Sequence, residues 1–417
     1  MSKRDPLGSN YRKLWMAGGI SSLGDGVRIA VLPLLAASFT RDPVTVSLIA
    51  MAGGLPWLLF SVVSGALIDR LDRRRTMWRV DAFRAVVMLG LGLAVVTHFA
   101  RIPLLVAVAF AIGTGETLFD NASLAIMPSV VKKRQLEEAN SRLQGVQIVS
   151  REFVGPPLGS LMFAVMVTSP FFLDAASFAL SAVLVLSMRG SFRAKGAKNS
   201  GTSSMWTEIA EGFRWLWANR LLRSLAVILG VWNLLQTAYF AVFVLYALEI
   251  LQLQPSVYGV LLAVYAIGSL GGSFIARKVS ARFGPGPTLI ACMVAGAISA
   301  LTLGITSSAI LAAAALMLDG VGGIVWNIVT ISLRQEIIPD ALLGRVSADF
   351  RFIGMGSLPV GALLGGILAR AFGLRFPFLL TGVCIAGMTL AALPILNNHT
   401  IEAARIASAV GEEYHDG

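Results

Sequence analysis

The chain has 417 residues, of which 56% are hydrophobic and only 14% are charged, and its mean hydropathy is +0.76. A composition this apolar excludes an ordinary soluble domain and predicts a polytopic membrane protein. The formal net charge of +11 is divided among short clusters between apolar segments. This distribution indicates an orientation signal and contact with anionic membrane lipids, and it argues against a nucleic-acid partner.

Apolar runs of about 20 to 27 residues, each long enough to cross a bilayer, recur along the chain. Six of them lie at 12–38, 44–69, 77–99, 102–127, 138–165 and 169–189. Six more lie at 223–249, 255–281, 286–306, 308–334, 346–370 and 375–396. The sequence therefore predicts an all-α membrane protein with 12 transmembrane helices in two pseudo-symmetric six-helix bundles.

The basic residues predict the orientation of these helices. Alternating crossings put the basic stretches on one side of the membrane, at 70–79, 132–134, 189–198, 277–282 and 334–345. The opposite loops hold only Arg41, Arg101 and the two arginines of 370–375. Because Lys and Arg collect in cytoplasmic loops, we expect a multi-pass protein of the bacterial cytoplasmic (inner) membrane with both termini in the cytoplasm.

A polar stretch rich in Gly, Ser, Lys and Asn separates the two sets of runs and has the composition of a flexible linker. The apolar residues of 206–223 recur at helical spacing, which suits an amphipathic helix on the membrane surface. We therefore divide the chain into an N-terminal bundle at 1–189, a cytoplasmic linker with an amphipathic helix at 190–222, a C-terminal bundle at 223–396 and a cytoplasmic tail at 397–417.

The connector between the second and third runs reads Gly-Ala-Leu-Ile-Asp-Arg-Leu-Asp-Arg-Arg-Arg-Thr from Gly65 to Thr76. This pattern resembles the signature loop between helices 2 and 3 of the major facilitator superfamily, and the whole chain resembles the superfamily's twelve-helix drug and siderophore exporters. Asp72 stands where that family usually has Gly. The resemblance implies a role in conformational gating for Gly65, Asp69, Arg70, Arg73 and Arg74.

Further gating candidates lie outside this loop. The segment from Gly155 through Pro156 and Pro157 to Gly159 predicts a bend with tight helix contacts, because small residues allow close packing and prolines remove backbone hydrogen bonds. It resembles the antiporter motif of the superfamily's exporters, and a generic Gly/Pro bend is the alternative. Asp81 and Arg84 at i,i+3 spacing, together with Arg345, suggest a cytoplasmic salt-bridge layer that holds one conformation shut.

Ionisable residues inside apolar runs are the candidates for proton coupling, because a charge in hydrocarbon costs about 2.5 to 3.5 kcal/mol or more and needs a partner or water. Asp25 lies near the middle of the first run between two glycines. Such a carboxylate is able to hold and release a proton. The alternative is a pair with Arg28 at i,i+3, which needs no transport role.

Glu116 and Asp120 share one face of the fourth run, where two carboxylates favour one shared proton or a bound cation. Arg151 and Glu152 on the fifth run sit at a similar depth, and one of them is placed to neutralise that face. A static bridge between Glu116 and Arg151 is the alternative, since it would lock two helices together without carrying anything.

The superfamily lines its cavity mainly with helices 1, 4, 7 and 10. By this resemblance, the second half contributes Trp232, Asn233, Gln236, Tyr239, Asp319, Trp326 and Asn327 to a substrate cavity. Aromatic surface with a few polar anchors is typical of an adaptable small-molecule site. Aromatic faces above acidic residues would suit an amphipathic cation. Anchoring at the lipid interface is the competing interpretation of the two tryptophans.

The chain contains no Gly-x-x-x-x-Gly-Lys-Ser/Thr loop, no His-Glu-x-x-His and no Cys-x-x-Cys. We therefore expect neither an enzyme nor a metal or cofactor site. The predicted function is secondary export of amphipathic small molecules such as drugs, by proton antiport and alternating access, in a monomer. The alternatives are a dedicated exporter of one metabolite such as a siderophore, and a lipid-handling or non-transporting membrane protein on the same fold.

Overall fold

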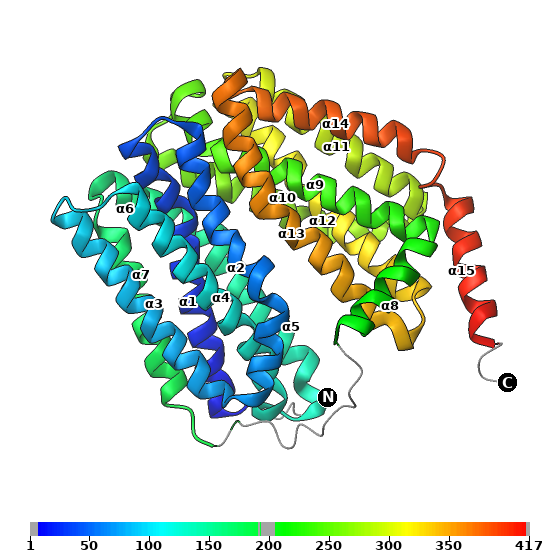
Figure 1. Cartoon of the computed structure of the whole chain (residues 1–417), viewed down its shortest axis with the longest axis horizontal. Helices are drawn as coiled ribbons and strands as arrows, with labels where there is room; N and C mark the ends of the chain where they lie inside the picture. Colours follow the sequence, from blue (N-terminus) through cyan, green and yellow to red (C-terminus); the bar gives the residue numbers. More distant parts are fainter. Residues whose placement is uncertain (1–6, 191, 193–204, 414–417) are drawn as a thin grey trace. The chain divides into compact units, whose positions relative to one another are not determined.

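A computed structural model describes residues 7–190, 192 and 205–413, except the side chains of 61–70, 205–210, 340–341 and 407–413. The described residues are almost all helical and include no β-strand (Figure 1). Nine of the described helices are long and apolar enough to cross a membrane. The predicted all-α membrane class is confirmed, whereas the count of twelve crossings stays a prediction.

The chain divides into two compact units, and each is described by itself. The first unit is Met1–Asn199 with Gln252–Ala263, and the second is Ser200–Leu251 with Val264–Gly417. The division after Asn199 falls inside the stretch that the composition marks as a linker. The sequence gives no sign that a short segment after residue 251 belongs with the first unit.

The first unit contains seven α-helices with one 3₁₀ turn and one π-helical segment. They are α1 (Ser9–Phe39), α2 (Pro43–Arg70), α3 (Arg73–Val96), α4 (Ile102–Val130), η1 (Lys133–Gln135), α5 (Leu136–Ile148), η2 (Val149–Val154), α6 (Gly155–Val165) and α7 (Ser169–Leu186). The segments α5, η2 and α6 follow one another without a break, so they form one continuous rod. Helix α1 packs against α4, α5, α6, α7 and η2 and has the largest buried share of the apolar helices.

Two glycines allow α1 and α6 to pack closely. A Cβ atom added at Gly155 would clash with the backbone of Gly26, and one added at Gly26 would clash with the backbone of Arg151. Pro156 and Pro157 occupy the first turn of α6, directly after the π-helical segment, where they remove two backbone N–H donors from the continuous helical rod. The predicted bend is therefore a π-helical segment followed by a proline-led helix start.

Asp72 has a structural role at the position where the family usually has Gly. Its side chain accepts a hydrogen bond from the backbone N–H of Arg75 at 2.9 Å, which caps the N-terminus of α3. Arg74 donates through Nε to the carbonyl of Val185 at 3.3 Å and through Nη2 to that of Leu186. The start of α3 is thereby tied to the C-terminal carbonyls of α7.

The second unit contains α8 (Met205–Ala218), α9 (Arg220–Leu245), η3 (Tyr246–Ile250), most of α10 (Pro255–Phe283), α11 (Pro285–Ile305), α12 (Ala309–Ile337), α13 (Asp340–Phe372), α14 (Phe376–Ala392) and α15 (Asn398–Glu413). Its core joins apolar side chains of α9, α11, α12 and α13, including Trp232, Met293, Trp326 and Phe350. Helix α9 begins at a cap, because the Asn219 side chain accepts from the N–H of Leu222 at 3.1 Å.

The amphipathic segment and the C-terminal segment both pack as helices on the second unit. Helix α8 contacts α13, and Glu211 forms an ion pair with Arg345 at 2.6 Å. The segment predicted as a cytoplasmic tail contains α15, on which Ile401 is buried and Arg405 bonds Glu336 at 2.6 Å. An apolar stripe on α15 explains why this polar segment still packs on the unit.

Candidate functional site

The first unit holds a cluster of charged side chains, buried except for the partly exposed Arg151, which we call the ion network. Its members are Asp25 and Arg28 of α1, Asp81 and Arg84 of α3, Glu116 of α4 and Arg151 of η2. Arg28 Nη2 lies 3.1 Å from Asp25 Oδ1 and 2.9 Å from Glu116 Oε2. Arg151 Nη2 contacts the other oxygen of Glu116 at 2.6 Å. These bonds connect three helical elements through one glutamate.

Arg84 extends the network to α3. Its Nη2 bonds Asp25 Oδ1, and its Nη1 lies 3.2 Å from Asp81 Oδ1 and 3.3 Å from Ser21 Oγ. The guanidinium group also stacks over the Phe178 ring of α7, 3.8 Å from its centroid. Arg84 and Asp81 are both 0% exposed. A guanidinium group suits this position because its planar fork bonds two carboxylates and stacks on a ring at once.

The network is balanced in charge, with three carboxylates against three guanidinium groups. Every carboxylate contacts at least one guanidinium group, and Arg28 and Arg84 each contact two carboxylates. Balance matters here because removing one partner from a buried pair leaves an uncompensated charge and costs about 3 to 5 kcal/mol. The network therefore joins α1, α3, α4 and η2. Loss of any member should lower the stability of the folded protein.

The structure brings together residues that the sequence had separated. Asp25, Glu116 and Arg151 were grouped as proton-coupling candidates, whereas Asp81 and Arg84 were expected in a separate cytoplasmic layer. That separation was wrong, because Arg84 bonds Asp25 directly. The two alternatives considered for this region, the Asp25–Arg28 pair and the Glu116–Arg151 bridge, are both present and share Glu116 through Arg28.

Two other proton-coupling candidates lie outside the network. Glu152 is exposed and forms no ion pair within the described part of the chain, so it does not neutralise the α4 face. Asp120 is half-buried one turn after Glu116 and likewise makes no ion pair there. Arg151, the neighbour of Glu152, turns inward because the wide π-helical turn shifts the register of the side chains around it.

The gating candidates have varied surroundings. Arg74 caps α7, Arg345 pairs with Glu211, and Gly155 packs on α1 together with Gly159, whose added Cβ would meet the Val27 backbone. Arg73 is the first residue of α3. The surroundings of Gly65 and the side chains of Asp69 and Arg70 lie outside what the structure describes. Their gating role stays a prediction.

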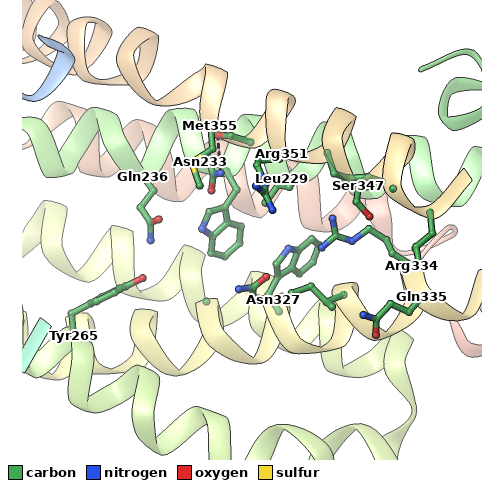
Figure 2. Close-up of a pocket in the computed structure, with 18 residues that line it drawn as sticks. Leu229, Asn233, Gln236, Tyr265, Asn327, Arg334, Gln335, Ser347, Arg351 and Met355 are labelled. Carbon is green, nitrogen blue, oxygen red and sulfur yellow. Dashed lines mark hydrogen bonds between the residues drawn. The ribbon is translucent and has the colours of Figure 1, made fainter. Parts of the chain in front are cut away.

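The second unit contains a pocket of about 710 Å³ between α9, α10, α12 and α13. Five predicted cavity residues line it, and they are Trp232, Asn233, Gln236, Trp326 and Asn327. The rings of the two tryptophans are nearly parallel, with centroids 6.1 Å apart and an interplanar angle of 14°. Asn233 Nδ2 donates to the carbonyl of Gly354 at 3.0 Å, which fixes its amide against α13 (Figure 2).

Asp319 and Tyr239 were predicted in the cavity, and neither lines the pocket. Asp319 is 4% exposed, and its Oδ2 accepts from Tyr239 Oη at 2.7 Å and from Gln236 Nε2 at 3.2 Å. The prediction of direct cavity contact was wrong because two donors already satisfy this carboxyl oxygen behind the pocket wall. Asp319 instead orients Gln236, whose side chain does reach the pocket (Figure 2).

The charged side chains that line the pocket are Arg334 and Arg351, and no carboxylate is among the lining residues. Figure 2 shows both arginines extending from α12 and α13 into the space beside Asn327. Arg334 stacks over the Phe350 ring at 4.6 Å and bonds the Thr330 carbonyl through Nε at 3.3 Å. Within the described lining, the acidic anchor expected for an amphipathic cation is therefore missing, and hydrogen-bond donors predominate.

The sequence contained signals for the residues that were missed. Arg334 follows Trp326 by eight positions and Asn327 by seven, which places it on the same face of one helix. Asp174 of α7 is completely buried beside the network, and Ser177 and Ser181 continue a polar stripe from it. Such a stripe inside an apolar helix marks a face turned towards protein rather than lipid.

Comparison with known proteins gives the family. Residues 2–413 match the model of a family of the major facilitator superfamily that is described as "Transmembrane secretion effector". The chain belongs to this family. The resemblance to the major facilitator superfamily that the connector after α2 indicated is thus confirmed.

Relatives of this family member include named efflux proteins. The multidrug efflux pump Tap of Mycolicibacterium fortuitum is 26% identical over 91% of this chain and 92% of its own length. Macrolide efflux protein A of Streptococcus pyogenes is 22% identical over 93% of this chain and 96% of its own. An uncharacterized transporter of the superfamily from Bacillus subtilis, YfiS, is 27% identical over 87% of both chains.

Solved structures share the fold of this family member at low sequence identity. A mutant of the nucleoside transporter NupG is 11% identical, with a TM-score of 0.75 over 93% of this chain and 100% of its own. A bacterial homologue of the iron transporter ferroportin is 15% identical, with a TM-score of 0.72 over 93% of this chain and 99% of its own. At these identities the likeness establishes the fold alone.

Proposed function

We propose that this protein is a secondary exporter of amphipathic small molecules, including antibiotics, that works by alternating access and proton antiport. The observation that carries the proposal is the pocket of the second unit, where a stacked tryptophan pair lies beside amide and guanidinium donors. Efflux by the relatives Tap and macrolide efflux protein A supports it. We further propose that the protein works as a monomer in the cytoplasmic membrane, with both termini in the cytoplasm.

The proposed topology has twelve crossings in two bundles of six. It counts the continuous rod α5–η2–α6 as one crossing and α9–η3 as another, because neither is interrupted. With α1 to α4, α7 and α10 to α14, the crossings then number twelve, and α8 and α15 lie outside the membrane. Helix α3 is less apolar than its neighbours because basic residues fill its first turns.

The pocket's chemistry suggests which molecules it accepts. Two indole rings provide a flat apolar surface, and Gln236, Arg334 and Arg351 offer N–H donors. A ligand with an apolar body and several carbonyl, ether, hydroxyl or carboxylate oxygens fits this set of groups. Such molecules bind through the ring surface, and the donors then orient their oxygen atoms.

An inward proton flow supplies enough energy for such export. The membrane potential contributes about 2.3 kcal/mol per charge per 100 mV. One pH unit adds about 1.4 kcal/mol. One proton therefore supports a substrate gradient on the order of hundreds-fold, and the carboxylates of the first unit are the groups available to carry it.

Transport in proteoliposomes tests the proposal. We expect a pH gradient to drive uptake of erythromycin, tetracycline or a fluorescent dye into proteoliposomes that contain the protein in inside-out orientation. Addition of substrate should release protons from these proteoliposomes. A siderophore transported to the exclusion of the other compounds would favour the dedicated exporter. Movement of fluorescent lipid between leaflets with no substrate-linked proton flux would favour the lipid-handling alternative and reject the proposal.

A further inference from the structure

Asp174 is a buried carboxyl group with almost no hydrogen-bonding partner. It lies on α7, which packs against α1 and α3, and it is 0% exposed. Its Oδ1 accepts from Ser177 Oγ at 3.5 Å, the outer limit of a hydrogen bond, and its Oδ2 has no partner among the residues that the structure describes. A carboxylate normally gathers several donors when it is buried, so this environment is unusual for the charged form.

The side chain is pressed against the backbone of α1. A Cβ atom added at Gly24 would overlap both Asp174 Oδ1 and Ser177 Oγ. The absence of a side chain at Gly24 is therefore what allows the Asp174 carboxyl to lie beside the helix that carries the network. Close packing at this point also closes the carboxyl off from water, in agreement with its zero exposure.

Among the described residues Asp174 forms no ion pair, although Arg28 and Arg84 lie close enough to act on it through space. The charged groups that face it are Asp25 and Arg28 on α1 and Asp81 and Arg84 on α3. The third packed helix, α6, carries no charged residue. The two arginines already bond Asp25, Asp81 and Glu116, and no ion pair to Asp174 forms within the described part of the chain.

The charge balance of the network decides the state of this residue. The three guanidinium groups of the network form their ion pairs with Asp25, Asp81 and Glu116, so an ionised Asp174 would add a negative charge without an ion pair of its own inside a membrane protein. Burial of an unpaired carboxylate is far more costly than burial of the neutral acid. The neutral acid needs only one acceptor, for its O–H group. Its carbonyl oxygen tolerates the lack of a donor.

We propose that Asp174 is a proton-binding site, occupied by one proton in the described conformation, and that this proton passes to water admitted when the contact between α7 and α1 at Gly24 opens during transport. The second part rests on the proposed antiport function. Asp25, which accepts from two guanidinium groups, then serves as a fixed counter-ion that holds Arg28 and Arg84. This assignment moves the proton carrier from α1 to α7.

Infrared spectroscopy of the purified full-length protein tests the first part without any substrate. A protonated carboxylic acid has a C=O stretching band that a carboxylate lacks, and the band shifts in deuterated water. We expect a band in the wild type that disappears in Asp174→Asn and persists in Glu138→Gln, a change in an exposed ion pair of the same unit. An unchanged band in Asp174→Asn would overturn the proposal.

The stability of the same variant gives an independent readout. The Asn amide resembles the neutral acid in size and charge, so Asp174→Asn should keep the melting temperature within a few degrees of wild type. If Asp174 were ionised and paired with another charged group, this substitution would instead destabilise the protein strongly. If Asp174→Asn does not fold, that result itself contradicts a neutral Asp174, and the wild-type band remains measurable.

Transport tests the second part and separates it from the proposed function. In inside-out vesicles, Asp174→Asn should lower pH-driven erythromycin uptake about tenfold or more, and it should keep erythromycin exchange without a gradient within about twofold of wild type. Unchanged pH-driven uptake would remove Asp174 from coupling. If the wild type moves none of the compounds tested, the export function fails, whereas the infrared result still decides the proton site.

Discussion

Arg28 Nη2 lies 2.9 Å from Glu116 Oε2, and this bond ties the centre of α1 to α4. The same nitrogen lies 3.1 Å from Asp25, and Glu116 uses its second oxygen for Arg151. The Arg28 guanidinium group therefore lies between two carboxylates, and each of these carboxylates also bonds a second arginine. The consequence is that charge neutrality in this region is a property of the whole network rather than of one pair.

Replacement of Arg28 by Ala should destabilise the protein strongly. Asp25 and Glu116 would lose a shared partner in a buried site, at a cost of about 3 to 5 kcal/mol. We expect a clearly lower melting temperature in detergent, measured by intrinsic fluorescence. Arg142→Ala is the matched control, because its pair with Glu138 at 2.7 Å is largely exposed and contributes less than about 1 kcal/mol. Equal melting temperatures for the two variants would contradict the network's role.

The bridge between Glu116 and Arg151 should show coupling in a double-mutant cycle. Glu116→Gln and Arg151→Gln each leave a charged partner in the network, whereas the double variant removes both charges together. We therefore expect the double variant to be more stable than the sum of the single effects predicts, by about 1 kcal/mol or more. Chemical unfolding or thermal shifts of the four proteins measure this difference. Additive effects would mean that the bond at 2.6 Å contributes no net stability.

Trp326→Ala should weaken substrate binding several-fold to about tenfold, because it removes one wall of the aromatic pair. Quenching of intrinsic fluorescence or binding of radiolabelled erythromycin measures the change. Trp217→Ala on α8 is the matched control, since this tryptophan stacks on Phe213 outside the pocket and is 42% exposed. Equal losses in both variants would indicate a general effect on the protein rather than on the pocket.

Asp319→Asn distinguishes a ligand contact from a supporting role. We expect binding to fall by only about twofold to threefold, because Asp319 acts on the pocket through Gln236. Gln236→Ala removes a group that lines the pocket and should weaken binding more. The reverse order, with binding abolished in Asp319→Asn and retained in Gln236→Ala, would return Asp319 to the ligand-contacting residues.

Asp72→Ala should lower stability by about 0.5 to 2 kcal/mol through loss of the α3 cap. Asp72→Asn keeps a side-chain oxygen able to accept from the N–H of Arg75 and should stay close to wild type. Asp72→Gly, which installs the residue usual in the family, should cost only a few tenths of a kcal/mol. Thermal stability of the three variants in one detergent tests this order. A stable Asp72→Ala variant would show that the cap contributes nothing.

The fold class and the approximate positions of the helices followed from the sequence. A span of hydrocarbon requires about 20 apolar residues, and such runs are visible without any tertiary information. The predicted run at 12–38 became α1 at Ser9–Phe39, and the run at 308–334 became α12 at Ala309–Ile337. The sequence did not predict α15, because a short amphipathic helix in a polar segment depends on the surface that it covers.

The sequence also determined which charged residues had to be explained, because an ion in an apolar run needs a partner or water. Local spacing identified the pair of Asp25 with Arg28, since residues three apart share one helix face. It did not reveal that Arg84 of α3 reaches Asp25, or that Asp319 lies behind the pocket wall. Those outcomes depend on helix rotation and on contacts between residues far apart in the chain.

What only the tertiary structure decided is the partnership of each ionisable group. Asp25 and Asp174 are both aspartates inside apolar runs, and local spacing offers a basic partner, Arg28, to Asp25 alone. In the folded protein Asp25 accepts from two guanidinium groups, whereas Asp174 meets the backbone of α1 at Gly24 and a distant serine hydroxyl. The sequence supplies the charges, but the packing of α7 against α1 and α3 determines which carboxyl groups pair with arginine and which, among the described residues, forms no ion pair.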